Sequence, residues 1–224
     1  MNKLKISDED RSINGPMEQM VSTYDAYMRK MTFGREQVLR QRTVDLALIK
    51  PGDSVLEVGC GTGSLTLAAK RRVGPSGKVV GIDVIPGMVE YSQRKAEQAH
   101  EDITFQLGSI NDIPFADNTF DAVIGSFMIF HMSEETRKKG IAEIYRVLKP
   151  QGRLLIVDLA MPVQPLHQAI AKRIIFRGGL EHNLQELLPI MEAAGFSDIE
   201  HAPVKFSILG LSILAFVRGN AKKL

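Results

Sequence analysis

The chain has 224 residues, 44% of them hydrophobic and 24% charged, and its formal net charge is +2 at pH 7. This length lies near the upper end for one domain, and the apolar content is sufficient for a full hydrophobic core. No run of about 18 apolar residues occurs, so we expect no membrane-spanning helix, and the N-terminus is too polar for a signal peptide. The single cysteine, Cys60, excludes an internal disulfide and fits a reducing cytosol, which predicts a cytoplasmic protein.

Composition also argues against two kinds of partner. The histidines are scattered and, with one cysteine, offer no spacing typical of metal ligands, so we expect no metal site. The basic residues form only short runs, at 70–72 and 137–139, whereas nucleic-acid binding would need a longer basic stripe. We therefore expect a small-molecule partner and no nucleic acid. The sequence makes no prediction about the oligomeric state.

The N-terminal part differs in composition from the rest of the chain. Residues 1–16 are polar and end in an Asn-Gly-Pro turn signal. Residues 17–33 are rich in methionine and tyrosine but lack a clean helical stripe. We expect residues 1–33 to form an arm and a lid, followed by one domain over residues 34–224.

From residue 34 onward, strand-like and helix-like segments alternate. Short apolar runs bounded by turn residues predict strands at 55–58, 78–83, 103–107, 120–126, 153–159, 199–206 and 211–217. Apolar spacing and capping signals predict helices after Gly34, near Ser64, from Pro86 toward His100, after Ser133, and from Leu184 to Gly195. This alternation is typical of βαβ units, so we expect an α/β fold with a parallel sheet covered on both faces.

The stretch VLEVGCGTG at 55–63 organises this pattern. A short buried strand carries Glu57 near its end and leads into glycines at alternate positions. These are Gly59, Gly61 and Gly63. Glycine lacks a Cβ, so such a turn can take positive φ and lie close to a ligand. The helix beginning near Ser64 offers unpaired N–H groups and a partial positive charge to a ligand carboxylate.

This loop is not the dinucleotide fingerprint, which would need its third glycine at Ser64. An acid followed by alternating glycines is typical of class I S-adenosylmethionine (SAM) methyltransferases, and the chain resembles that class. Asp83 ends the next strand, where a carboxylate can accept both hydroxyls of a ribose. Three alternatives remain: a ligand-free turn, a SAM-binding protein without catalysis, and a nucleotide-binding oxidoreductase.

Three further segments carry a narrower resemblance: MTFGR at 31–35, DNTFD at 117–121 and YRVLKPQGRL at 145–154. With the glycine loop, they make the chain similar to the ubiquinone/menaquinone-biosynthesis C-methyltransferases over about residues 24–162. The resemblance implies a Rossmann-like seven-stranded sheet in the order 3-2-1-4-5-7-6, with strand 7 antiparallel and helices on both faces. It also implies SAM as methyl donor and S-adenosylhomocysteine as product.

The chain departs from those quinone enzymes after the fourth strand. They carry Phe-Gly-Leu-Arg-Asn-Val there, and the Arg and Asn help the catalytic site. This chain has FMIFHM at 127–132, so Phe130 and His131 replace both polar residues. The acceptor is therefore expected to be small and apolar or aromatic, with quinone-like C-methylation as one option. A lipid quinone acceptor would imply peripheral membrane contact.

The resemblance implies a cofactor site at the ends of the first four strands and in the lid. Its expected residues are Tyr24, Glu57, Gly59, Cys60, Gly61, Gly63, Asp83, Val84, Ser109, Ile110, Ser126 and Phe127. Glu57 would face the amino group of the donor, or merely cap the loop. Ser109 stands where the family usually has an acid for the adenine, and it can accept one weaker hydrogen bond. We expect Cys60 to be a small buried residue, not a nucleophile.

His131 is the ionisable residue that we expect beside the methyl acceptor. An imidazole titrates near neutral pH and can act as a general base. A packed or solvent-facing histidine is the alternative, and Asp158 could face the substrate in its place. A set of methionine and tyrosine side chains is expected to line an apolar pocket, or else to be ordinary core: Met20, Tyr24, Tyr27, Met28, Met128, Met132 and Met161.

Overall fold

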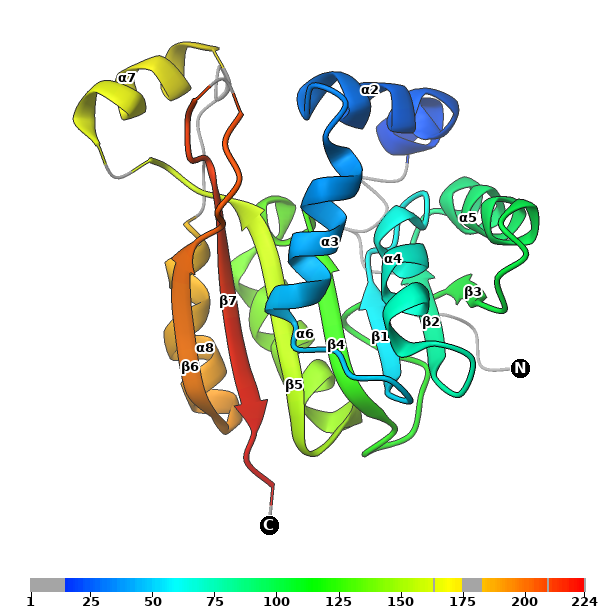
Figure 1. Ribbon diagram of the computed structural model, residues 1–224. Helices are drawn as coiled ribbons and strands as arrows, with labels where there is room; N and C mark the ends of the chain where they lie inside the picture. The colour runs from blue at the N-terminus through cyan, green and yellow to red at the C-terminus, as the bar shows by residue number, and fades with distance from the viewer. Residues whose placement is uncertain (1–14, 163, 175–182, 209, 224) are drawn as a thin grey trace.

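The computed structural model describes residues 15–162, 164–174, 183–208 and 210–223, apart from the side chains of His131 and Ile174. Its centre is a seven-stranded sheet in the order β3-β2-β1-β4-β5-β7-β6, which confirms the expected order (Figure 1). The strands are β1 Ser54–Val58, β2 Lys78–Asp83, β3 Thr104–Leu107, β4 Phe120–Ser126, β5 Leu148–Leu159, β6 Phe196–Pro203 and β7 Leu214–Ala221. Strands β1 to β5 pair in parallel, and β7 is antiparallel to both β5 and β6, as expected.

Helices cover both faces of the sheet (Figure 1). They are α2 Tyr24–Met31, α3 Glu36–Leu46, α4 Ser64–Val73, α5 Pro86–Gln98, α6 Glu134–Val147, α7 Pro165–Ile174 and α8 Leu187–Ala194, with 3-10 turns η1 Val21–Thr23, η2 Ile129–His131 and η3 Leu184–Glu186. Helices α3 and α4 pack on one face, whereas α6 and α8 pack on the other. Helices α2 and α7 lie beyond the sheet, at the edge where the parallel strands end (Figure 1).

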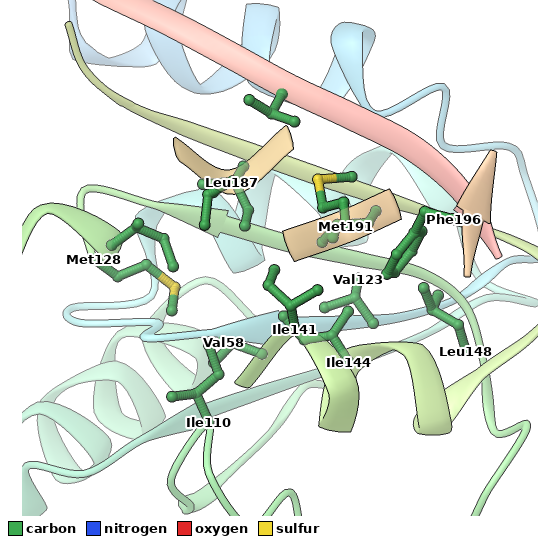
Figure 2. Close-up of a cluster of buried hydrophobic side chains, with 14 of the residues drawn as sticks. Val58, Ile110, Val123, Met128, Ile141, Ile144, Leu148, Leu187, Met191 and Phe196 are labelled. Atoms are coloured by element: carbon green, nitrogen blue, oxygen red, sulfur yellow. The ribbon is translucent and has the colours of Figure 1, made fainter. Parts of the chain in front are cut away.

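Alternation along the strands divides the core between the two faces. In β1, Val55 joins the cluster under α3 and α4, while Leu56 and Val58 join the cluster under α6 and α8. Successive strand residues point to opposite faces, so Glu57 shares the α3 and α4 side with Val55. Figure 2 shows the second cluster, in which Met128 lies at one end and Phe196 at the other.

Several helix ends follow the sequence signals. The Ser133 hydroxyl accepts a hydrogen bond from the Thr136 N–H at 3.2 Å, which confirms the expected cap of α6. Gly195 closes α8 in a left-handed conformation, with φ of 101°. Pro189 lies in the first turn of α8, where its missing N–H costs no intrahelical bond. The helix therefore starts late, after η3, because proline is tolerated only near a helix start.

Three boundaries differ from those expected. Strand β5 begins at Leu148, before the predicted start at residue 153, because residues 148–152 form a bulge within the strand. Strands β6 and β7 are each displaced by a few residues from the predicted 199–206 and 211–217. Both belong to an antiparallel hairpin whose register depends on pairing with β5, and local propensity does not encode that pairing.

Candidate functional site

The glycine loop joins β1 to α4 in left-handed backbone conformations. The φ angles are 67° at Gly59, 52° at Gly61 and 76° at Gly63, a region that other residues rarely adopt. A Cβ on Gly63 would also lie 2.9 Å from Cβ of Ser92. Gly63 directly precedes α4, so the first N–H groups of that helix face the loop. The loop therefore has the shape that was predicted for the approach of an anionic ligand group.

Glu57 is buried beneath this loop, with 1% of its surface exposed. The Thr66 hydroxyl, on α4, donates a hydrogen bond to Oε2 of Glu57. Burial raises the pKa of Glu57 to about 8, although Thr66 and the Arg40 charge act in the opposite direction. At neutral pH the carboxyl therefore binds a proton, which a nearby cation such as an ammonium would displace.

Asp83 ends β2 and is also buried. Its Oδ2 accepts the Gly61 N–H at 2.8 Å, and its Oδ1 accepts the Ile85 N–H at 3.0 Å. These two bonds join the glycine loop to the chain after β2 and fix the carboxyl between them. Val84 follows directly and is half-buried. A carboxylate held in this way suits the predicted acceptance of ribose hydroxyls.

Arg40 is a site residue that the sequence analysis missed. It lies on α3 with only 7% of its surface exposed. Its Nη1 donates to the Ser126 hydroxyl at 2.9 Å, and its Nη2 lies 3.2 Å from Oε1 of Glu36. The guanidinium carbon also lies 5.8 Å from the centre of the Phe127 ring. Glu36 and Arg40 are four residues apart, a spacing typical of an exposed helical ion pair, so no sequence signal revealed the burial.

Tyr24 reaches the site from α2. A Cβ on Gly61 would lie 4.0 Å from Cε1 of Tyr24, so the ring lies over the glycine loop. Burial raises the pKa of the Tyr24 phenol, the Arg40 charge lowers it, and the Asp83 charge raises it further. Arg40, Asp83 and Tyr24 are thus close enough to influence one another, and the ring covers the loop from the side of the predicted lid.

Asp25 fastens α2 to the rest of the site. Its Oδ1 accepts the Thr62 hydroxyl of the glycine loop at 2.6 Å, and its Oδ2 accepts Lys95 Nζ of α5 at 2.8 Å. The Tyr91 hydroxyl donates to the same oxygen at 3.2 Å. Burial alone would raise the pKa of Asp25, but the hydrogen bonds from Lys95 and Thr62 outweigh it and lower the pKa. One carboxylate therefore joins α2 to two elements of the donor site.

Ser109 and Ile110 follow β3, and both are buried. The Ser109 hydroxyl accepts the Asn111 N–H at 3.2 Å. The side chain of Ile110 packs against α6, where a Cβ on Gly140 would lie 2.6 Å from it. The Ile110 side chain therefore belongs to the core, and any adenine contact at this residue would come from its backbone. The contact of Ser109 with adenine stays a prediction.

Cys60 is buried within the loop, and its N–H donates to the Ile82 carbonyl at 3.0 Å. Burial raises the pKa of the Cys60 thiol, and the charges of Asp83 and Glu57 raise it further. The thiol is thus neutral at physiological pH and packs beside Phe105. A neutral thiol is a poor nucleophile, which agrees with the predicted packing role.

Ser126 ends β4 at the same end of the sheet, and Phe127, which follows it, takes a left-handed φ of 57°. The chain then forms η2, which His131 ends, but the side chain of His131 lies outside the described part of the structure. Asp158 does not face outward toward a substrate. Its carboxyl is buried, and Oδ2 accepts the N–H groups of Ile129 at 2.8 Å and of the next residue at 3.3 Å.

The methionine and tyrosine side chains that were expected to line an apolar pocket, or to be ordinary core, differ in burial. Met28 and Met128 are buried, whereas Tyr27 is 47% exposed on α2.

No group of three or more His, Cys, Asp and Glu side chains that could bind a metal occurs among the described residues. No helix in the described ranges is both long and apolar enough to cross a bilayer. A groove of about 690 Å³ between α6 and α8 is lined by none of the predicted site residues.

Comparison with known proteins identifies close relatives. Residues 55–152 match a methyltransferase domain family. Demethylmenaquinone methyltransferase of Symbiobacterium thermophilum is 36% identical over 157 residues, which are 69% of this chain and 62% of that protein. Demethylmenaquinone methyltransferase of Thermus thermophilus is 34% identical over 224 residues, covering 90% of this chain and 98% of the relative. A SAM-dependent methyltransferase from Aquifex aeolicus, known from its crystal structure, is 25% identical, with a TM-score of 0.68 and coverage of 91% and 98%.

These matches agree with the geometry of the site. The chain spans 62% of the length of the Symbiobacterium protein, but nearly all of the Thermus protein. Glu57, the glycine loop and Asp83 all lie inside the matched domain. The cofactor of this family is SAM, which confirms the predicted cofactor. The chain belongs to the class I SAM-dependent methyltransferases and resembles the ubiquinone/menaquinone C-methyltransferases.

Proposed function

We propose that this protein transfers a methyl group from SAM to a ring carbon of a small, quinone-like aromatic acceptor in its reduced form. The observation that carries the proposal is the convergence of Glu57, Asp83 and Arg40 around a left-handed glycine loop. The Thermus relative, matched over almost its whole length, is a demethylmenaquinone methyltransferase by name and supports the choice of acceptor.

The charges of the site match the amino-acid end of the donor. We propose that Glu57 faces the ammonium of the donor and that Arg40, a buried guanidinium whose Nη2 pairs with Glu36, faces its carboxylate. The first N–H groups of α4 add a partial positive charge at the glycine loop, which also favours a carboxylate. Asp83 is fixed by backbone N–H groups and would accept the ribose hydroxyls. We infer that these residues hold SAM, whose contribution to the chemistry is an electrophilic methyl group.

The acceptor must be electron-rich at carbon for this transfer. A hydroquinone ring donates electron density to the carbon beside its hydroxyl, whereas the oxidised quinone withdraws it. In the balanced reaction a new C–CH₃ bond replaces a ring C–H bond, S-adenosylhomocysteine leaves, and one proton is released. His131 follows β4, and we propose its imidazole as the group that receives this proton.

Most of the rate enhancement would come from positioning. Holding an acceptor carbon in line with a reactive methyl, with water excluded, can supply a large part of a transfer barrier. Tyr24 lies over the glycine loop and Asp25 accepts the Thr62 hydroxyl of that loop, and we propose that residues 17–33 act as a lid over the donor. The first residues of the arm, 1–14, lie outside the described structure. A cytoplasmic location, and membrane contact through a lipid quinone, belong to the same proposal.

The test is methyl transfer to demethylmenaquinol with a short side chain, reduced chemically before the assay. We expect formation of S-adenosylhomocysteine together with a quinol product that is heavier than the substrate by one CH₂ group. The oxidised demethylmenaquinone serves as the control and should give no product. If the protein binds S-adenosylhomocysteine but methylates no quinol, the assignment of the donor site stands and the assignment of a quinol acceptor is refuted.

One further candidate function is a SAM-binding protein without catalysis. It is favoured by the replacement of the polar Arg and Asn of the quinone enzymes with Phe130 and His131. Incubation of this protein with labelled SAM and cell extract distinguishes the two functions. Transfer of label to a small molecule only when the protein is present excludes the non-catalytic alternative.

A further inference from the structure

Asp158 is a buried acid outside the donor site. It lies near the end of β5, directly after Val157, which pairs with Ser126 of β4. Only 1% of its surface is exposed. Isolated charge at such depth is costly, so a buried acid normally has strong hydrogen-bond partners.

The partners of Asp158 are backbone N–H groups of the chain that follows β4. Oδ2 accepts the N–H of Ile129 at 2.8 Å and that of Phe130 at 3.3 Å, while Oδ1 accepts the N–H of Leu159 at 2.7 Å. The backbone of Met128 also hydrogen-bonds to this carboxyl. One side chain on β5 therefore holds the start of η2, the turn that ends at His131.

The chain after β4 needs such support. Phe127 adopts a φ of 57°, a conformation that is unfavourable for a bulky residue and persists only where its surroundings enforce it. Its N–H donates to the Val157 carbonyl at 3.0 Å, next to the Asp158 hydrogen bonds. The left-handed turn and η2 are thus both fastened to the end of β5.

The position of this turn also affects the glycine loop. A Cβ on Gly125 would lie 2.7 Å from Sδ of Met128, and a Cβ on Gly59 would lie 3.2 Å from Cβ of Met128. Met128 therefore fills the space between the two glycines, at the end of the cluster in Figure 2. Movement of residues 127–130 would therefore shift the Met128 side chain, which packs against Gly59 of the donor loop.

We propose that Asp158 is a positioning residue of the methyl transfer: it fixes the backbone of residues 128–130 and thereby orients the acceptor-side turn toward the donor. This inference rests on the proposed function. Asp158 is not a base for the acceptor, because both of its oxygens already accept backbone N–H groups and the side chain is buried. Burial raises the pKa of Asp158 to about 7, and the N–H donors act against this rise.

The test compares Asp158→Asn with the control Asp121→Asn. Asp121 also accepts a backbone N–H, from Ser54 at 2.9 Å, but it lies at the start of β4. The asparagine side chain in Asp158→Asn keeps one acceptor oxygen and replaces the other with an NH₂ group, which cannot accept from the N–H groups of η2. We expect their hydrogen exchange, at Ile129 and Phe130, to be about tenfold faster. We expect kcat/KM for demethylmenaquinol to fall about 10²-fold, mostly in kcat, because misplaced reactants lose rate steeply.

Affinity for S-adenosylhomocysteine should change less than about threefold in Asp158→Asn, and Asp121→Asn should leave all three measurements unchanged. Unchanged exchange at Ile129 and Phe130, or normal turnover despite faster exchange, would overturn the proposal. If the wild type does not methylate the quinol, the proposed function fails and the role of Asp158 in methyl transfer fails with it, whereas faster exchange in Asp158→Asn still supports its role in fixing residues 128–130. If the Asn variant does not fold, the amide resonances of Ile129 and Phe130 in the wild type are followed against pH. If both resonances shift with pH and have the same midpoint, the hydrogen bonds to Asp158 are supported. If they have no common midpoint, those hydrogen bonds are refuted.

Discussion

Binding of the donor should displace a proton from Glu57. The carboxyl is buried, and its pKa of about 8 means that it is mostly protonated at pH 7. An ammonium placed nearby lowers the pKa of an acid by about 1–3 units. The pKa of Glu57 would therefore fall to roughly 5–7 in the complex, and about 0.4–0.9 protons would be released per site at pH 7.

The same linkage sets the pH dependence of affinity. Between pH 6 and 7.5, the affinity for S-adenosylhomocysteine should increase by roughly 3- to 20-fold, because less work is needed to ionise Glu57 at the higher pH. Calorimetry in buffers of different ionisation enthalpy measures the protons released, and titrations at several pH values measure the affinity.

Glu57→Gln is the matched control for this prediction. Glutamine keeps the shape of the side chain and can still accept the hydrogen bond from Thr66, but it has no proton to release. We expect weaker binding with a flat pH dependence in this range. If proton release is the same in wild type and Glu57→Gln, then Glu57 does not face the ammonium, and another group must account for the protons.

Four other measurements test the site and the fold. Asp83→Ala should weaken S-adenosylhomocysteine binding by about 1.5–3 kcal/mol, the range for hydrogen bonds to a charged group, and unchanged calorimetric affinity would remove Asp83 from the site. Asp25→Asn should weaken the attachment of α2 to Thr62 and Lys95, so limited proteolysis near residues 17–33 should become faster, most clearly without ligand; equal cleavage rates would argue against this attachment. His131→Ala should lower quinol turnover by about 10²-fold while donor affinity stays the same, whereas near-normal turnover would leave positioning as the whole mechanism. The raised pKa values of Glu57 and Asp158 mean that these carboxyls bind protons more tightly in the native state than in the unfolded chain. Their contribution to the free energy of unfolding, measured by chemical denaturation, should therefore fall as pH rises from about 4 toward 8. A smaller fall in Glu57→Gln than in wild type would identify the contribution of Glu57.

Much of the fold could be predicted because its signals are local. The glycine loop requires positive φ at Gly59, Gly61 and Gly63, and the structure has it at all three. Ser133 caps α6 as its position before an acidic turn suggests. The boundaries of β6 and β7 were less predictable, because their register depends on β5 and a shift of a few residues leaves the local composition almost unchanged.

The site residues divide in the same way between local and distant causes. The positions of Glu57 and Asp83 could be predicted, because each lies at or next to the end of a strand that leads into a turn with its own sequence signal. Arg40 and Asp158 could not, because their roles depend on partners far along the chain: Ser126 for Arg40, and Ile129 for Asp158. Both residues contact the chain that leaves β4. The glycine loop, Glu57 and Asp83 thus come from one continuous stretch, whereas Arg40 of α3 and Asp158 of β5 reach the end of β4 and the chain after it from distant parts of the sequence, and it is there that the chain departs from the quinone enzymes.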